Sequence, residues 1–189
     1  MNRCGVLVVL VMFVIFALTL GNALAVAQAQ PTISFDLVPA SAAVATCLPY
    51  ATAHVTVALK EDTQGTDTLH LTARNLPPDT DFAVFLTSAD AFATPPFGAV
   101  QYIGDFTTNA AGVGKVKIQA IVAEAFVSTL VNSSRLREDL DHLVFWFADP
   151  NQAQAACGLR NTTVFDGDGH AGPAAMSSQG ATGLEQFPE

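Results

Sequence analysis

The alternation of apolar and polar residues along this chain is typical of short β-strands separated by turns. Thr52–Lys60 alternates cleanly, with valine and leucine on one side and mostly polar residues on the other. That two-residue period indicates a half-buried strand. Thr68–Arg74 repeats the pattern after a polar turn, so the two segments predict a hairpin with one wet face. A turn centred near Gln64 places His54 opposite Arg74.

Two further segments, Phe82–Thr87 and Leu143–Ala148, are apolar on both sides. Such short apolar runs are expected where a strand is buried on both faces, so these are the predicted central strands. Prolines within Asn75–Thr80 remove backbone donors and predict a turn. The remaining predicted strands are Ile33–Val38, Ala99–Thr107, Lys115–Ala123 and Thr162–Phe165.

The end of the chain gives weaker patterns. Within the stretch Glu124–Asp141, the segment Ser134–Leu140 is compatible with a short helical turn between strands, and this alternative stays open. From Asp166 onward Gly, Ala, Ser and Gln dominate, and such a segment has little to bury. We therefore expect residues 166–189 to form a flexible or disordered tail.

About seven to eight short strands with regular turns predict an all-β fold, a single antiparallel β-sandwich. The expected domain covers residues 31–165. Leu69–Val84 resembles the strand, Leu-Pro-Pro turn and aromatic-bearing strand of fibronectin-type-III-like and other immunoglobulin-like modules. Gly104–Gly112 is similar to a strand-turn unit of bacterial secreted sandwich proteins. The resemblance implies an immunoglobulin-like fold and no particular activity.

The first 29 residues have the three parts of a signal peptide, which predicts an N-terminal signal helix. A basic start at Arg3 precedes the apolar run Val6–Leu20 and small residues up to Ala29. We expect cleavage after Ala27 or Ala29. The alternative is a retained anchor, but a spanning helix needs roughly 20 apolar residues. The predicted location is secreted or extracytoplasmic, meaning the periplasm, the cell envelope or the extracellular space, with no membrane attachment after cleavage.

Charge and cysteine content narrow the function further. The chain has 8 basic and 17 acidic residues, a formal net charge of −9. Its basic residues are interspersed with acids, so nucleic-acid binding is not expected. Cys4 leaves with the signal peptide, and an even pair in an exported domain favours a disulfide between Cys47 and Cys157. Two free thiols or a metal pair are the alternatives.

The four histidines raise the question of a metal site. No His-x-His pair occurs on a predicted strand, so a copper-zinc dismutase type of centre is not expected. Asp166-Gly167-Asp168-Gly169-His170 resembles the opening of a calcium loop but lacks the later ligands of an EF-hand. Asp166, Asp168 and His170 are therefore weak metal candidates, and no cofactor is predicted.

Motifs for nucleophilic catalysis and phosphate binding are missing from the sequence. Asp141 and His142 are adjacent, but neighbours within a strand point to opposite faces. No catalytic residue is therefore predicted.

Aromatic residues gather in and beside a long segment stiffened by Pro95 and Pro96. Phe92, Phe97 and Tyr102 are candidate ligand contacts, because binding modules place such residues on loops held by a rigid scaffold. Packing of these rings beneath the loop is the alternative.

Together these features predict a secreted binding or structural module that contacts an extracellular protein or glycan. One alternative is a metal-assisted extracellular enzyme that uses His and Asp residues, such as His142, at a sandwich edge. Another is an envelope or matrix component without a specific ligand.

Overall fold

The computed structural model describes residues 31–60, 65–160 and 171–186. The predicted signal peptide and the weak metal candidates Asp166, Asp168 and His170 lie outside these residues. The elements in chain order are β1 Thr32–Pro39, α2 Ala42–Cys47, β2 Thr52–Ala58, β3 Asp67–Arg74, β4 Asp81–Thr87, β5 Val100–Thr107, β6 Gly114–Ala120, β7 Phe126–Val131, β8 Ser134–Asp139, β9 His142–Phe147, α3 Pro150–Cys157, β10 Ala174–Ser177 and the 3-10 turn η2 Leu184–Gln186.

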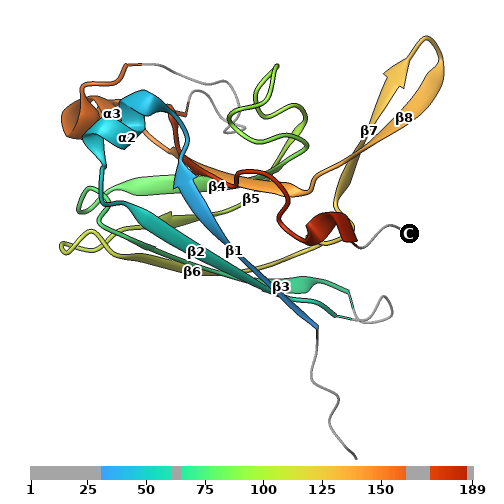
Figure 1. Cartoon of the computed structure of the whole chain (residues 1–189), viewed down its shortest axis with the longest axis horizontal. Helices are drawn as coiled ribbons and strands as arrows, with labels where there is room; N and C mark the ends of the chain where they lie inside the picture. Colours follow the sequence, from blue (N-terminus) through green and yellow to red (C-terminus); the bar gives the residue numbers. More distant parts are fainter. Residues whose placement is uncertain (1–30, 61–64, 161–170, 187–189) are drawn as a thin grey trace, which may run out of the picture.

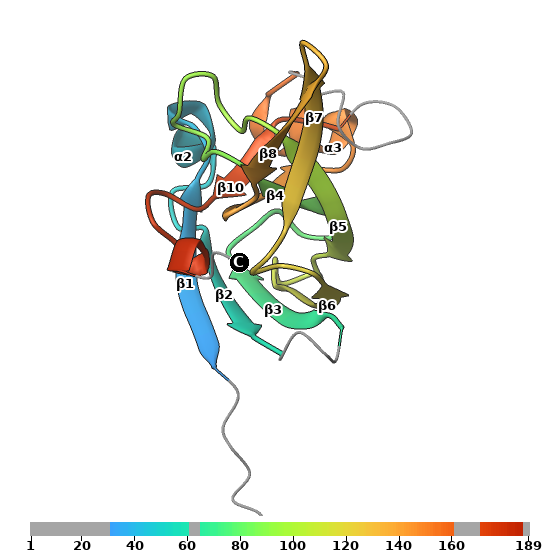
Figure 2. The ribbon, with the colours of Figure 1, turned by 90° about the vertical axis from the view of Figure 1, so that its right-hand side faces the viewer.

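Eight strands pair antiparallel in the order β5-β4-β9-β10-β1-β2-β3-β6 and fold into two facing layers (Figures 1 and 2). Strand β1 belongs to both layers, because Thr32–Leu37 pairs with β2 whereas Val38 and Pro39 pair with β10. We call β1, β2, β3 and β6 sheet A, and β5, β4, β9 and β10 sheet B. The predicted all-β sandwich is confirmed, and its immunoglobulin-like kinship stays a prediction.

The main core lies between the two sheets and follows from the alternation of the sequence. Val55 and Val57 of β2 point inward from sheet A and are fully buried. From sheet B, Phe82 packs its ring 5.1 Å from Phe106 and 5.3 Å from Phe145. These rings and aliphatic side chains supply most of the apolar burial that stabilises the domain.

Strands β4 and β9 are buried on both faces, as their continuous apolar sequences predict. A second cluster covers the outer face of sheet B and consists of Ala83, Phe85, Val144, Trp146 and Ala171, with Phe97, Val100, Ala148 and Ala174 packed against it. The covering residues come from the loop between β4 and β5 and from the segment that leads into β10.

The prediction of a disordered tail is wrong for residues 171–186. Strand β10 pairs with β9 and β1, and its Ala175 and Met176 are fully buried. The segment has few large apolar residues, so its order comes from long-range pairing with β9 and not from a local pattern. Residues 166–170 and 187–189 lie outside the described parts of the chain.

The possible helical turn at residues 134–140 is replaced by strand β8. Asn132 and Ser133 both adopt positive φ, 48° and 69°, as a two-residue hairpin turn requires. They reverse the chain directly from β7 into β8, so that Val131 pairs with Ser134. The register of the β2–β3 hairpin also differs from expectation by two residues, because His54 pairs with Thr72 and not Arg74.

Two short helices were not predicted, although α3 carries recognisable end signals. Asp149 caps its start by accepting a hydrogen bond from the backbone N–H of Asn151 at 2.7 Å, and Pro150 follows the cap. Gly158 ends the helix in the left-handed conformation. This Asp-Pro start and glycine end are the usual helix boundaries. No helix among the described residues is long and apolar enough to cross a membrane.

Cys47 and Cys157 form the predicted disulfide, with their Cα atoms 5.4 Å apart. Each is the last residue of its helix, so the bond joins α2 to α3 and ties the beginning of the sandwich to its end. The bond indicates an oxidising, extracytoplasmic compartment.

Removing this cross-link should destabilise the fold without changing it. The bond spans a sequence separation of 110 residues, for which loop-closure entropy gives about 4 kcal/mol. Cys47→Ala/Cys157→Ala should lower the free energy of unfolding by about that amount in urea titrations followed by Trp146 fluorescence. Reductant should lower the free energy of unfolding of the wild-type protein by the same amount and leave that of the double variant unchanged. A reductant effect on the variant would contradict this assignment.

Candidate functional site

The β7–β8 hairpin projects away from the two layers of the sandwich (Figures 1 and 2). Its two strands pair only with each other among the described residues. Every position of β8 is exposed, including Leu136 at 51%, and Leu130 of β7 is 70% exposed. Phe126 and Val131 are also exposed. The hairpin thus presents large apolar side chains to solvent on a free-standing ribbon.

The two faces of the hairpin differ. Phe126 and Leu130 share one face with Arg135 and Arg137, because these residues are cross-strand neighbours. The Arg137 guanidinium lies 4.1 Å from the centre of the Phe126 ring, a cation–π contact. Val131 and Leu136 lie on the opposite face. Each face of the hairpin therefore carries large apolar side chains next to its polar Asn132-Ser133 turn.

The base of the hairpin is fixed to the body of the protein. The N–H of Leu140 donates to the carbonyl of Ala125 at 2.8 Å, and Leu140 is buried. Glu138 accepts a hydrogen bond from the hydroxyl of Ser88. Ser88 begins the loop between β4 and β5, and its oxygen also accepts from the N–H of Ala99 at 2.8 Å. The hairpin and this loop are thus held together at one end of the molecule.

The three predicted contact residues have different environments. Phe97 packs its ring 5.0 Å from that of Trp146 and anchors the loop, which is the alternative given by the sequence. Tyr102 lies beside Phe85 at 5.6 Å and remains 49% exposed, with its hydroxyl donating to Asp105. Phe92 is 47% exposed. Phe92 and Tyr102 therefore remain available for contact, whereas Phe97 belongs to the cluster over sheet B.

The sequence did not identify the hairpin as a binding candidate. Residues 126–131 have the aromatic and β-branched composition of an ordinary strand, with apolar residues on both faces. Among the described residues no further strand pairs with the hairpin to cover Leu130 and Leu136. The one local signal is the Asn-Ser turn, which favours a tight hairpin.

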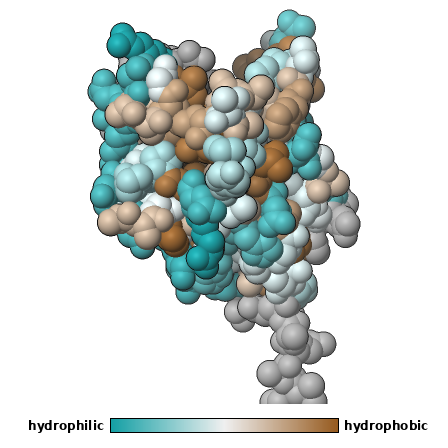
Figure 3. All heavy atoms as spheres, turned by 60° about the vertical axis from the view of Figure 1, so that its left-hand side comes forward, coloured by the Kyte–Doolittle hydropathy of each residue, from teal (hydrophilic) through white to brown (hydrophobic). Residues whose placement is uncertain are grey.

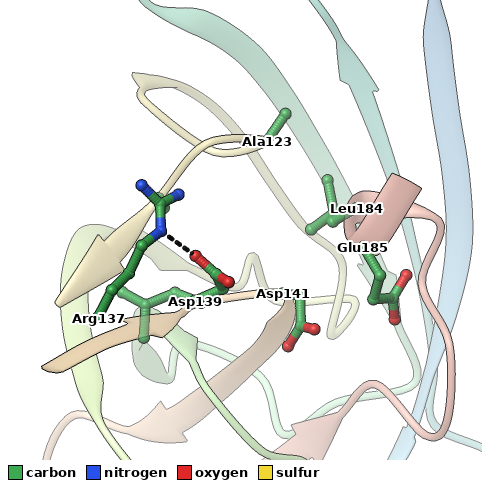
Figure 4. A pocket seen from close by; sticks show the side chains of 8 residues that line it. Ala123, Arg137, Asp139, Asp141, Leu184 and Glu185 are labelled. Carbon is green, nitrogen blue, oxygen red and sulfur yellow. Dashed lines mark hydrogen bonds and ion pairs between the residues drawn. The ribbon is translucent and has the colours of Figure 1, made fainter. Parts of the chain in front are cut away.

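A pocket of about 150 Å³ lies at the base of the hairpin (Figure 4). Its lining residues are Ala123, Ala125, Arg137, Asp139, Leu140, Asp141, Leu184 and Glu185. Arg137 forms an ion pair with Asp139, with 2.6 Å between Nε and Oδ1. The other carboxylates come from opposite sides, since Asp141 precedes β9 and Glu185 belongs to η2. The pocket thus contains two carboxylates in addition to the Arg137–Asp139 ion pair.

The pKa values of the other two carboxylates of this pocket, Asp141 and Glu185, shift in opposite directions. Burial raises the pKa of Asp141 above its ordinary value, and the nearby His142 only partly offsets that effect. Burial acts in the same direction on Glu185, but hydrogen bonds from backbone N–H groups outweigh it and lower its pKa. Two of these donors are the N–H groups of Thr182 at 2.8 Å and Gly183 at 2.7 Å.

Asp141 and His142 are closer than the sequence argument allowed. Asp141 precedes the strand, so its Oδ1 lies 3.6 Å from His142 Nε2. His142 Nδ1 is 3.2 Å from the hydroxyl of Ser178, which completes a Ser-His-Asp set. Ser178 is 1% exposed, however, and its oxygen also accepts the N–H of Leu143 at 3.1 Å. The set therefore joins the C-terminal segment to β9 and offers substrate no access to a nucleophile.

The other two described histidines, His54 and His70, lie on the outer face of sheet A. His54 Nδ1 lies 2.7 Å from Asp36 on the outer face of sheet A, and His70 is exposed on the same face. Within residues 31–60, 65–160 and 171–186, no group of three or more His, Cys, Asp or Glu side chains is arranged to hold a metal ion.

The two pocket carboxylates should affect stability in opposite directions. Asp141 has a raised pKa, so its ionised form opposes folding, and Asp141→Asn should raise the melting temperature at neutral pH. Glu185 has a lowered pKa, so its charge stabilises the fold, and Glu185→Gln should lower the melting temperature. The difference in melting temperature between each variant and the wild-type protein should vanish as the pH falls below the pKa of the substituted carboxyl group. Melting curves from pH 3 to 7 test this, and shifts of equal sign would contradict it.

Comparison with known proteins identifies no relative. No family model matches this chain, no curated protein matches its sequence, and no solved structure matches its fold.

Proposed function

We propose that this protein is an exported binding module that contacts an extracellular protein partner through its β7–β8 hairpin. The observation that carries the proposal is the exposure of Leu130 and Leu136 on a ribbon that projects from the body. Covering a leucine side chain on binding yields about 1.5–3 kcal/mol. The hairpin offers one exposed leucine on each face, so either face gains free energy when a partner covers it.

A protein partner fits the hairpin better than a glycan does. Both strands leave one edge of backbone N–H and C=O groups without a partner strand among the described residues. An extended peptide segment can pair with such an edge and place its own apolar side chains against Val131 and Leu136. The aliphatic character of these side chains favours another apolar protein surface.

The pocket at the hairpin base suggests a further property of the partner. Asp141 and Glu185 carry carboxylates that no basic side chain of the described residues neutralises fully, and the chain as a whole has a net charge of −9. A partner with a basic residue near its apolar contact complements this arrangement.

Export is part of the same proposal. The N-terminal sequence has the form of a signal peptide, and the Cys47–Cys157 bond supports an oxidising compartment. The immunoglobulin-like resemblance is compatible with a binding role, since such sandwiches present contacts on their loops. No described catalytic or metal constellation favours the enzyme alternative.

Site-specific photo-crosslinking tests the contact surface. A photoreactive amino acid at position 130 or 136 of the protein secreted by its own producing cells should capture one recurring protein. The control position is Tyr50, which is 78% exposed in the turn between α2 and β2, at the far side of the molecule from the hairpin. Equal capture at position 50, or none at 130 and 136, would contradict the proposal.

Binding to the captured partner gives the quantitative test. Leu130→Ser/Leu136→Ser removes about 3 kcal/mol of apolar contact, which corresponds to a weakening of Kd of about a hundredfold. Tyr50→Ser should leave Kd unchanged. Both leucines are exposed, so the melting temperature of the double variant should stay close to that of the wild-type protein.

A further inference from the structure

Strands β2, β3 and β6 of sheet A present basic side chains on their outer face, although the chain as a whole is acidic. The outer face of β1 adds Asp36, which is paired with His54. The outward positions of β2, β3 and β6 are Thr52, His54, Thr56, Ala58, Thr68, His70, Thr72, Arg74, Lys115, Lys117 and Gln119. None of them is acidic. Figure 3 shows hydrophilic residues on the lower part of the molecule, at the height of these strands in Figure 1, with some hydrophobic ones among them.

The cationic side chains of this face are close together because of the strand register. His70 is paired with Lys117, and Thr72 with Lys115. Residues two apart on one strand face are separated by roughly 7 Å, and neighbouring strands by about 5 Å. A shallow hollow of about 210 Å³ lies here, lined by His70, Leu71, Thr72, Lys115, Val116 and Lys117.

Within the described parts of the chain, no carboxylate neutralises either lysine of the hollow. Lys115 and Lys117 form no ion pair with any described residue. The nearest carboxylate in the row of Lys115 is Asp36, across two intervening strands, and it is bound to His54 at 2.7 Å. Asp67 of β3 points away and accepts the backbone N–H groups of Lys60, Val122 and Ala123.

We propose that this face binds an acidic polysaccharide, a carboxylated or sulfated chain. Lys115 and Lys117 bind its anionic groups, while His70 and Thr72 hydrogen-bond its hydroxyl groups. The face is open and nearly flat, so it accommodates an extended polymer. The site is separate from the hairpin and does not depend on the protein partner proposed above.

Other polyanions fit this face less well. The outward positions of β2, β3 and β6 include no aromatic residue on which bases could stack, as sheet surfaces that bind single-stranded nucleic acid require. The same positions carry no large apolar side chain that could enter a lipid surface.

Binding to immobilised polymers tests the proposal at low and at physiological salt. The protein should bind dextran sulfate or polygalacturonate and not uncharged dextran, with affinity falling as salt rises. Lys115→Gln/Lys117→Gln should weaken binding about tenfold. The control Arg135→Gln/Arg160→Gln removes the same charge elsewhere and should retain wild-type affinity. Melting curves establish that both variants are folded.

Several outcomes would overturn the assignment. Lack of binding to both acidic polymers at low salt is one. Equal losses in the two double variants would show a non-specific charge effect. Tighter binding to single-stranded DNA, or to vesicles containing phosphatidylglycerol, would assign the face to nucleic acid or lipid. If the hairpin captures no partner but the protein still binds the acidic polymers, this proposal stands and only the proposed function fails. The two proposals can therefore be tested independently.

Discussion

The structure depends on the complete burial of the β4–β9 pair. Phe82, Phe145 and Phe147 fill the space between the sheets, while Phe85 and Trp146 project from the opposite face of the same strands. Both faces of this apolar pair of strands must be covered, because an aromatic ring left exposed to water does not contribute the free energy of its burial to stability. The loop between β4 and β5 and the segment leading into β10 therefore fold over sheet B. Ser88 of that loop bonds to Glu138, and so the cover of sheet B also holds the hairpin.

The two sheets consequently have different outer surfaces. Sheet B is covered, and Trp146 is so enclosed that its Nε1 has no hydrogen-bond partner among the described residues. Sheet A keeps the strict alternation of a one-sided sheet, with Val55 and Leu71 inward and His54 and Thr72 outward. Solvent-facing positions are free of packing constraints, so charge and hydrogen-bonding groups can collect there without cost to the core. The basic side chains of β2, β3 and β6 thus lie on the sheet face that the rest of the fold leaves open to solvent.

Much of this arrangement is encoded locally and could be predicted. The alternation of β2 and β3, the double-sided apolar runs of β4 and β9, and the cysteine pair all follow from short-range pattern and compartment. Strand β10 could not be predicted, because its alanines become buried only when β9 and β1 pair with it across a long sequence distance. The register of the β2–β3 hairpin shifted by two residues without exchanging its faces, since the period of a strand is two.

The hairpin shows why an exposed apolar surface is harder to predict than a core. Leu130, Val131 and Leu136 have the composition of an ordinary strand, and the local pattern of β7 would be equally suitable for a sheet interior. Their exposure arises only because the eight-stranded sheet is complete without β7 and β8. A two-stranded ribbon is marginally stable in water by itself, so the bonds at its base through Leu140 and Glu138 help to hold the hairpin in place. The apolar side chains of β7 and β8 stay exposed because the fold fixes the base of the ribbon and, among the described residues, supplies no further strand to pair with it.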